Sequence, residues 1–195
     1  MPTGLEAQGG ANLSADAAAV QAALSGRQEG YRILMDRHRE AVFRYARGHV
    51  GDDQDALDIT QDSFISAFAA LHRYDPERPF RGWILRIAIN RCRDWARRRK
   101  VRRMLLFARP IEDANEVSDP SPDPEAALSS AIGVARVRSA LAELPPSLKD
   151  PLMLCNLEGM SQDEAAQVLG ISRKAVETRI YRARQRLSEA LQEPS

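Results

Sequence analysis

Basic and apolar side chains alternate near the end of the chain, in the stretch ETRIYRARQRL (Glu177–Leu187). At about 100° per residue, a helix gives this stretch two faces. The apolar face consists of Val176, Ile180, Ala183 and Leu187. The opposite face consists of Thr178, Tyr181, Arg182 and Gln185, with Glu177 at its flank. This pattern predicts a helix that docks on its domain by the apolar face and lies in the major groove of DNA by the other.

The polar residues of this helix divide by the chemistry they could perform on DNA. Contacts to phosphates fix the position of a protein on DNA but carry no sequence information. For that role the candidates are Arg173, Lys174, Arg179 and Arg184. Base edges are read by hydrogen bonds, in which arginine pairs with guanine and glutamate with cytosine. The candidates for base reading are Glu177, Thr178 and Arg182. A basic helix that only faces water is the alternative.

The residues in front of the basic helix predict how it is positioned. Ser161 and Glu164 form the capping box SQDE, the helix that they open ends at Gly170, and Ser172 caps the next helix. A short capped helix, a glycine turn and a long basic helix are typical of a helix-turn-helix. This order argues against a helix that only faces water.

A second basic surface is predicted for residues 81–100. One helix face carries Arg86, Asn90, Arg93 and Arg97, opposite Ile84, Ala88 and Trp95. The loop in front of it, LHRYDPERPFRGW, adds three aromatic residues, Tyr74, Phe80 and Trp83. A cationic groove beside aromatic and amide groups is how proteins hold single-stranded nucleic acid. Tyr74 is the better candidate for a base contact, because Phe80 and Trp83 are expected in the core.

The helix before this loop has an acidic outer face. Asp55, Asp58 and Asp62 share that face with Ile59. An exposed isoleucine within an acidic stripe predicts a protein partner with a basic surface. An ordinary solvated acidic face is equally compatible with the composition.

Charge is segregated along the 195 residues, although the net charge is only +1. Thirteen basic and three acidic residues lie between 73 and 109, and six acids without a base lie between 110 and 128. The apolar spacing is helical, which predicts an all-α chain of two small helical domains. We expect an N-terminal extension (1–25), a helical domain (26–105), a flexible acidic, Pro-rich linker (106–128) and a helix-turn-helix domain (129–195). The linker acids, Glu112 to Glu125, are expected to screen the basic helices from DNA.

Other features limit the class of protein. Cys92 and Cys155 have neither metal-ligand nor CxxC spacing. The sequence shows no signal peptide and no apolar run of membrane-spanning length. We therefore expect a cytoplasmic binding protein that is not an enzyme, holds no metal or cofactor and does not insert into a membrane.

Three stretches carry a family resemblance: DALDITQDSFISAFAAL, FRGWILRIAINRCRDWARR and ELPPSLKDPLMLCNLEGMSQDEAAQVLGISRKAVETRIYRARQRL. In order and spacing, from about residue 28 to 191, they closely resemble bacterial RNA polymerase sigma factors of the extracytoplasmic-function group. The resemblance implies that the first domain is the family's second region and the last its fourth. It also implies three partners: core RNA polymerase, promoter DNA and an anti-sigma factor.

The resemblance further implies roles for individual residues. Asp58, Gln61 and Asp62 match the helix that docks on the polymerase clamp, and with Asp55 and Ile59 they form the expected polymerase surface. Tyr74 and Asn90 match the pocket for a flipped base of the minus-ten element, to which we add Arg86, Arg93 and Arg97. The groove-reading positions for the minus-thirty-five element are matched by Glu177, Thr178, Tyr181 and Arg182, and Ser172 lies at the start of that helix. Thr60 and Asp62 depart mildly from the family's clamp motif.

Two other functions remain open at this point. A one-component or response-regulator type repressor would bind duplex DNA directly, but the N-terminal half lacks the pattern of a ligand or phosphoacceptor domain. A sigma-like adaptor or decoy that binds an anti-sigma factor can be separated from a sigma factor only by an assay.

Overall fold

The computed structural model describes residues 15–107, 133, 136–137 and 139–192. Over these residues the regular secondary structure is helical and contains no strand, which confirms the expected all-α class. The predicted linker, apart from residues 106–107, lies outside the described residues, and so do residues 1–14 of the predicted N-terminal extension.

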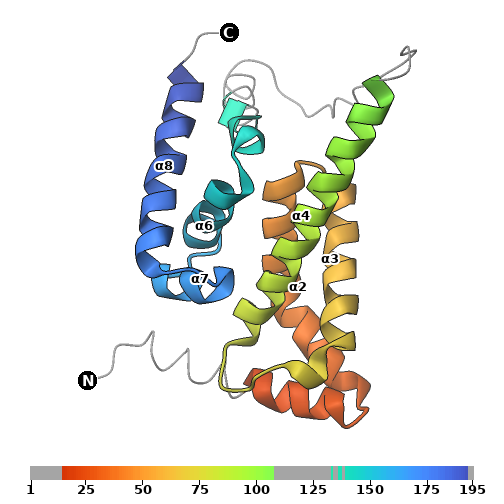
Figure 1. Cartoon of the computed structure of the whole chain (residues 1–195). Coiled ribbons are helices and arrows are strands. Elements are labelled where there is room, and N and C mark those ends of the chain that lie inside the picture. Colours follow the sequence, from red (N-terminus) through yellow and green to blue (C-terminus); the bar gives the residue numbers. More distant parts are fainter. Residues whose placement is uncertain (1–14, 108–132, 134–135, 138, 193–195) are drawn as a thin grey trace, which may run out of the picture.

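Three long helices build the N-terminal domain (Figure 1): α2 (Gln28–Val50), α3 (Asp53–Ala69) and α4 (Phe80–Phe107). The turn between α2 and α3 is short. Gly51 ends α2 with a positive φ of 83°, a conformation that glycine adopts without strain. Asp52 then caps α3 by accepting a hydrogen bond from the Asp55 amide at 2.9 Å. A 3-10 turn, η1 (Leu71–Arg73), and a loop lead into α4.

A further helix, over residues 15–24, packs against the start of α2. Ala19, Val20 and Ala23 are buried in the common core. Gly30 allows this packing, because a Cβ at that position would lie 2.4 Å from the Ala19 carbonyl oxygen. The structure thus places in the core of the N-terminal domain a segment that the sequence assigns to an extension.

The C-terminal domain consists of a helical segment over 139–143, then α6 (Pro146–Asn156), α7 (Gln162–Leu169) and α8 (Arg173–Gln192). Val176, Ile180 and Ala183 of α8 are buried, as predicted for its apolar face. In Figure 1, α6 and α7 stand between α8 and the N-terminal domain. The approach is close, because a Cβ on Gly82 of α4 would lie 3.3 Å from a methyl group of Val168 on α7. The two domains therefore pack directly on each other.

Candidate nucleic-acid and protein interfaces

The helix-turn-helix has the local geometry that its sequence predicts. Ser161 Oγ accepts a hydrogen bond from the Glu164 amide, and the Glu164 carboxylate accepts one from the Ser161 amide, which completes the capping box. Gly170 ends α7 with a φ of 67°. Ser172 then caps α8 by accepting a hydrogen bond from the Ala175 amide at 3.2 Å. These local contacts fix the angle at which α8 leaves the turn.

The outer face of α8 is polar and open to solvent. Tyr181 is 63% exposed, and Glu177, Arg182 and Gln185 are exposed beside it. Thr178 is half-buried, and its hydroxyl donates to the Lys174 carbonyl at 2.8 Å. The five residues of the face predicted to lie in the major groove are therefore present on one accessible helix, where they could contact base edges.

The predicted phosphate contacts border this face. Ser172, Arg173, Lys174 and Arg184 are exposed, and Arg179 is half-buried. Arg173 pairs with Asp163 at 3.3 Å, and Lys174 pairs with Glu177 at 3.0 Å. Such exposed ion pairs contribute about 1 kcal/mol or less, so DNA phosphates could displace the acids at small cost.

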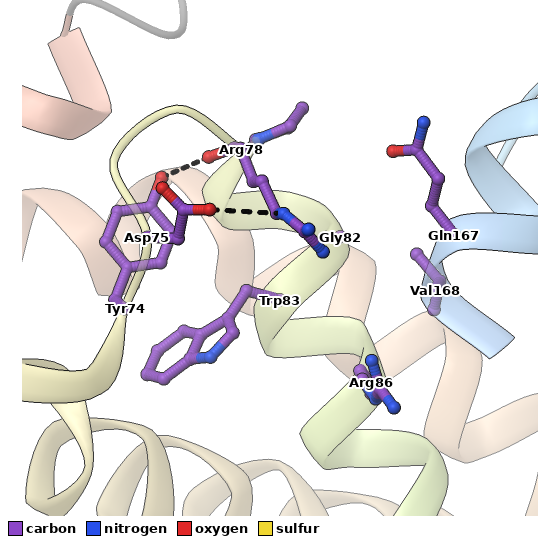
Figure 2. Close-up of a pocket in the computed structure, with 9 residues that line it drawn as sticks. Tyr74, Asp75, Arg78, Gly82, Trp83, Arg86, Gln167 and Val168 are labelled. Carbon is purple, nitrogen blue, oxygen red and sulfur yellow. Dashed lines mark hydrogen bonds and ion pairs between the residues drawn. The ribbon is translucent and has the colours of Figure 1, made fainter. Parts of the chain in front are cut away.

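A pocket at the start of α4 brings Tyr74 together with Arg86 and with two residues of α7 (Figure 2). The Tyr74 ring packs against Phe80 and Trp83, with 5.4 Å between ring centroids in each case. Its hydroxyl donates to the Arg78 carbonyl, and burial raises its pKa to about 12. Tyr74 is only 8% exposed, whereas Trp83 is half-buried. The residue preferred from the sequence as a base contact is thus the more buried of the two.

Asn90 lies in a second hollow rather than in the pocket of Tyr74. Both Asn90 and Arg97 are exposed, and the hollow is lined by Asn90, Arg93, Asp94, Ala96, Arg97, Lys100 and Pro146. The two hollows are both on α4, and each is bordered by residues of the C-terminal domain. The structure therefore divides the predicted minus-ten residues between two sites along one helix.

Arg93 is engaged across the domain interface. Its Nε and Nη2 atoms donate to Asp150 Oδ2 at 2.9 and 2.5 Å. Asp150 is fully buried, and it also accepts from the Tyr45 hydroxyl at 2.8 Å and from His49 Nε2 at 3.0 Å. Burial by itself would raise the pKa of Asp150, but the hydrogen bonds and charges of His49 and Arg93 outweigh burial and lower it.

Burial also changes the pKa values of the other titratable groups around Asp150. Burial lowers the pKa of His49, and the Asp150 hydrogen bond opposes this only in part. Lys149, buried beside them, donates to the His49 carbonyl at 2.9 Å, and burial lowers its pKa to about 8. Sequence reasoning missed this cluster, because the partners of Asp150 lie 57 to 105 residues away from it in the sequence.

The acidic face of α3 is present, but its apolar member is not the predicted one. Asp58, Gln61 and Asp62 are exposed and Asp55 is half-buried, whereas Ile59 is only 5% exposed. The prediction of an exposed Ile59 is therefore wrong. The reason is the helical period, which places position 59 in the buried stripe of Ala56, Ser63 and Ala67.

Two other apolar residues of α3 face solvent instead. Leu57 is 52% exposed and Ile65 is 59% exposed. At about 100° per residue both lie on the arc that also carries Gln61 and Asp58. The helical period could not have found Leu57 in the sequence, because seven residues return it to within about 20° of the buried Phe64. Leu57 and Ile65 give the acidic face the apolar contact area that Ile59 cannot supply.

Family models match both domains. One for Sigma-70 region 2 matches residues 34–102, and one for Sigma-70, region 4 matches residues 135–187. The RNA polymerase sigma factor CnrH of Cupriavidus metallidurans is 43% identical over 89% of this chain and 92% of its own length. This chain belongs to the extracytoplasmic-function group of sigma-70 factors. The sigma factor NccH of Alcaligenes xylosoxydans xylosoxydans is 40% identical over 92% of this chain and 96% of its own.

A solved structure shares the fold of this sigma factor. The structure of CnrH in complex with the cytosolic domain of CnrY matches with a TM-score of 0.68 and 36% identity, over 93% of this chain and 99% of that one. Across the described part of this sigma factor no helix is long and apolar enough to cross a membrane. The same residues contain no group of three or more side chains placed to hold a metal ion.

Proposed function

We propose that this sigma factor binds core RNA polymerase through α3, holds the melted minus-ten strand along α4 and reads the minus-thirty-five element with α8. The observation that carries the proposal is the arrangement of the three surfaces. An exposed acidic face with apolar neighbours, a basic helix with aromatic and amide groups, and an exposed recognition helix lie on separate elements of one chain. A DNA-binding repressor needs the third surface but not the first two.

The side chains of each surface suit the partner that we propose for it. The carboxylates of Asp58 and Asp62 suit a basic partner, and Leu57 and Ile65 add apolar area to the same contact. Exposed Asn90 and Arg97 can bond an unstacked base and its backbone. On α8, Arg182 and Glu177 can each select one base, while Arg173 and Lys174 hold phosphates.

The domain boundaries follow from these roles. Residues 26–105 carry the polymerase and minus-ten surfaces, and residues 129–195 carry the minus-thirty-five surface, with 106–128 as the tether between them. This activity needs no catalytic residue and no cofactor, and it takes place in the cytoplasm. The solved structure of CnrH is a complex with a second protein, the cytosolic domain of CnrY, which supports a protein partner for this chain as well. The resemblance to the family identifies that partner as an anti-sigma factor.

Run-off transcription tests the proposal. Purified core polymerase is mixed with this chain and with fragmented genomic DNA, and transcript starts are mapped. We expect starts at a small set of sites that share an upstream and a minus-ten sequence, and none with core polymerase alone. Retained binding to core polymerase without specific transcripts would instead favour the adaptor or decoy.

A further inference from the structure

Two buried carboxylates of the C-terminal domain point into the N-terminal domain. The first is Asp150, which accepts hydrogen bonds from Tyr45, His49 and Arg93. The second is Glu158, whose side chain is also fully buried. Its carboxylate accepts hydrogen bonds from Arg44 Nη2 at 3.1 Å and Arg81 Nη2 at 2.8 Å. Arg81 also donates to the Glu158 carbonyl at 2.7 Å.

Both carboxylates are satisfied only when the domains are closed. Within the described ranges, the hydrogen-bond partners recorded for these two side chains all lie on α2 and α4. A buried charge without a partner is strongly unfavourable, so any other close packing of the domains would be penalised. In an open chain water would solvate both acids. Asp150 and Glu158 therefore select one closed arrangement over other compact ones.

The closed arrangement borders the predicted minus-ten surface and engages one of its residues. Gln167 and Val168 of α7 border the pocket of Tyr74, Trp83 and Arg86 (Figure 2). Pro146 of α6 borders the hollow that contains Asn90 and Arg97. Arg93, between these two sites on α4, is bonded to Asp150. A nucleic-acid strand running along this face of α4 would meet the C-terminal domain at both hollows.

The other two surfaces stay open in the same arrangement. On α3, Asp58, Asp62 and Ile65 are exposed. On α8, Tyr181 and Arg182 are exposed. Closure therefore engages Arg93 of the strand-binding surface, whose Arg86, Asn90 and Arg97 stay exposed, and leaves the proposed polymerase and duplex contacts available.

We propose that Asp150 and Glu158 form an interdomain clasp that holds the free sigma factor closed and must release before α4 can take up melted DNA. The inference rests on the proposed function, because it takes α4 as the surface for the melted strand. A phosphate that approaches Arg93 competes with Asp150 for the same guanidinium group. The clasp and a bound strand therefore compete for Arg93, and each weakens the other.

The first test removes the two charges without changing side-chain shape, in the double variant Asp150→Asn, Glu158→Gln. The control, Glu143→Gln, Glu189→Gln, removes two exposed charges from the same domain. Small-angle X-ray scattering measures the radius of gyration of the full chain, and fluorescence anisotropy measures its binding to a labelled non-template strand. That strand comes from a promoter located by run-off transcription with the unmodified protein.

We expect a larger radius of gyration and about tenfold tighter strand binding for the clasp variant than for the control. Apparent affinity scales with the open fraction, so a protein that is closed about nine-tenths of the time gains this factor on opening. An unchanged radius of gyration would overturn the clasp. Opening without a gain in strand binding would overturn its blocking role.

A second variant locks the closed arrangement instead of opening it, and this test does not depend on how the first variant folds. Gly82→Cys with Val168→Cys places two thiols where α4 and α7 approach each other. Oxidation should link them, abolish strand binding and spare binding to core polymerase, and reduction should restore strand binding. Failure to form the cross-link, or full strand binding by the cross-linked protein, would overturn the proposal. Run-off transcription with the unmodified protein tests the proposed function separately, so failure of the clasp and failure of the proposed function can be distinguished.

Discussion

Arg93 and Arg182 are the same residue type on two basic helices, yet their surroundings give them different roles. Arg182 is exposed on the outer face of α8. Arg93 is half-buried and donates to a carboxylate of the other domain. Arginine is suited to both tasks, because its planar group binds a guanine edge or a carboxylate through paired donors. The contacts of each arginine, rather than its charge, therefore decide what its removal does.

Substitutions on α8 should separate base reading from phosphate binding. Arg182→Ala should cost about 1–3 kcal/mol of discrimination at one upstream base pair, because a paired hydrogen bond to one base is lost. Arg173→Ala should weaken binding to all promoters alike and reduce its salt dependence. Binding of the holoenzyme to a panel of single-base promoter variants, at several salt concentrations, measures both effects. Equal loss on every promoter for both variants would contradict the division.

Within the helix α3, substitutions on the exposed face and on the buried face should have different effects, one on polymerase binding and the other on stability. Asp58→Arg with Asp62→Arg should abolish binding to core polymerase and leave the fold intact, because both side chains are exposed. Ile59→Ala should instead lower the free energy of unfolding by about 2–5 kcal/mol, because it leaves a cavity in the core. Co-elution with core polymerase and thermal unfolding measure the two outcomes. A folded double-arginine variant that binds core polymerase at full affinity would refute the assignment of α3.

The contact of α2 with α6 should make domain closure depend on pH. His49 faces Asp150 and Lys149 of α6 and Arg93 of α4, and burial lowers its pKa in the closed state. In an open chain its pKa would be near the ordinary value of about 6.5, so the open state binds more protons as the pH falls. Lys149 acts in the same direction between about pH 8, its closed-state pKa, and its ordinary pKa of 10.5. Closure should therefore strengthen as the pH rises and weaken as it falls.

Fluorescence energy transfer between the two domains, from pH 8 to pH 5.5, checks this dependence. The unmodified protein should open progressively below about pH 6.5, the ordinary pKa of histidine. His49→Gln keeps a donor for Asp150 but cannot titrate, so it should stay closed over more of the range. An identical pH profile for the variant would show that His49 does not control closure.

For the whole molecule, local features were predictable from the sequence and distant ones were not. The helix-turn-helix was predictable because Ser161, Gly170 and Ser172 act within a few residues of their own position. The acidic neighbours of Ile59 suggest an exposed position, but the helical period places it in the buried stripe of α3. The clasp of Asp150 depends on contacts between segments far apart in sequence, whereas Tyr74 is packed against Phe80 and Trp83, within ten residues of it. Tyr45 and Asp150, for example, are separated by 105 residues.

In the whole molecule, the proposed role of α4 is to hold the melted strand when the holoenzyme opens a promoter. Permanganate reactivity of promoter thymines measures that opening, and Asn90→Ala is the cleanest variant, because the side chain is exposed. The control is Gln21→Ala, an exposed amide on the helix over 15–24. We expect Asn90→Ala holoenzyme still to protect promoter duplex from nuclease but to leave its thymines largely unreactive, while the control melts normally. Thymines as reactive with Asn90→Ala as with the unmodified protein would contradict the role of α4 in holding the melted strand.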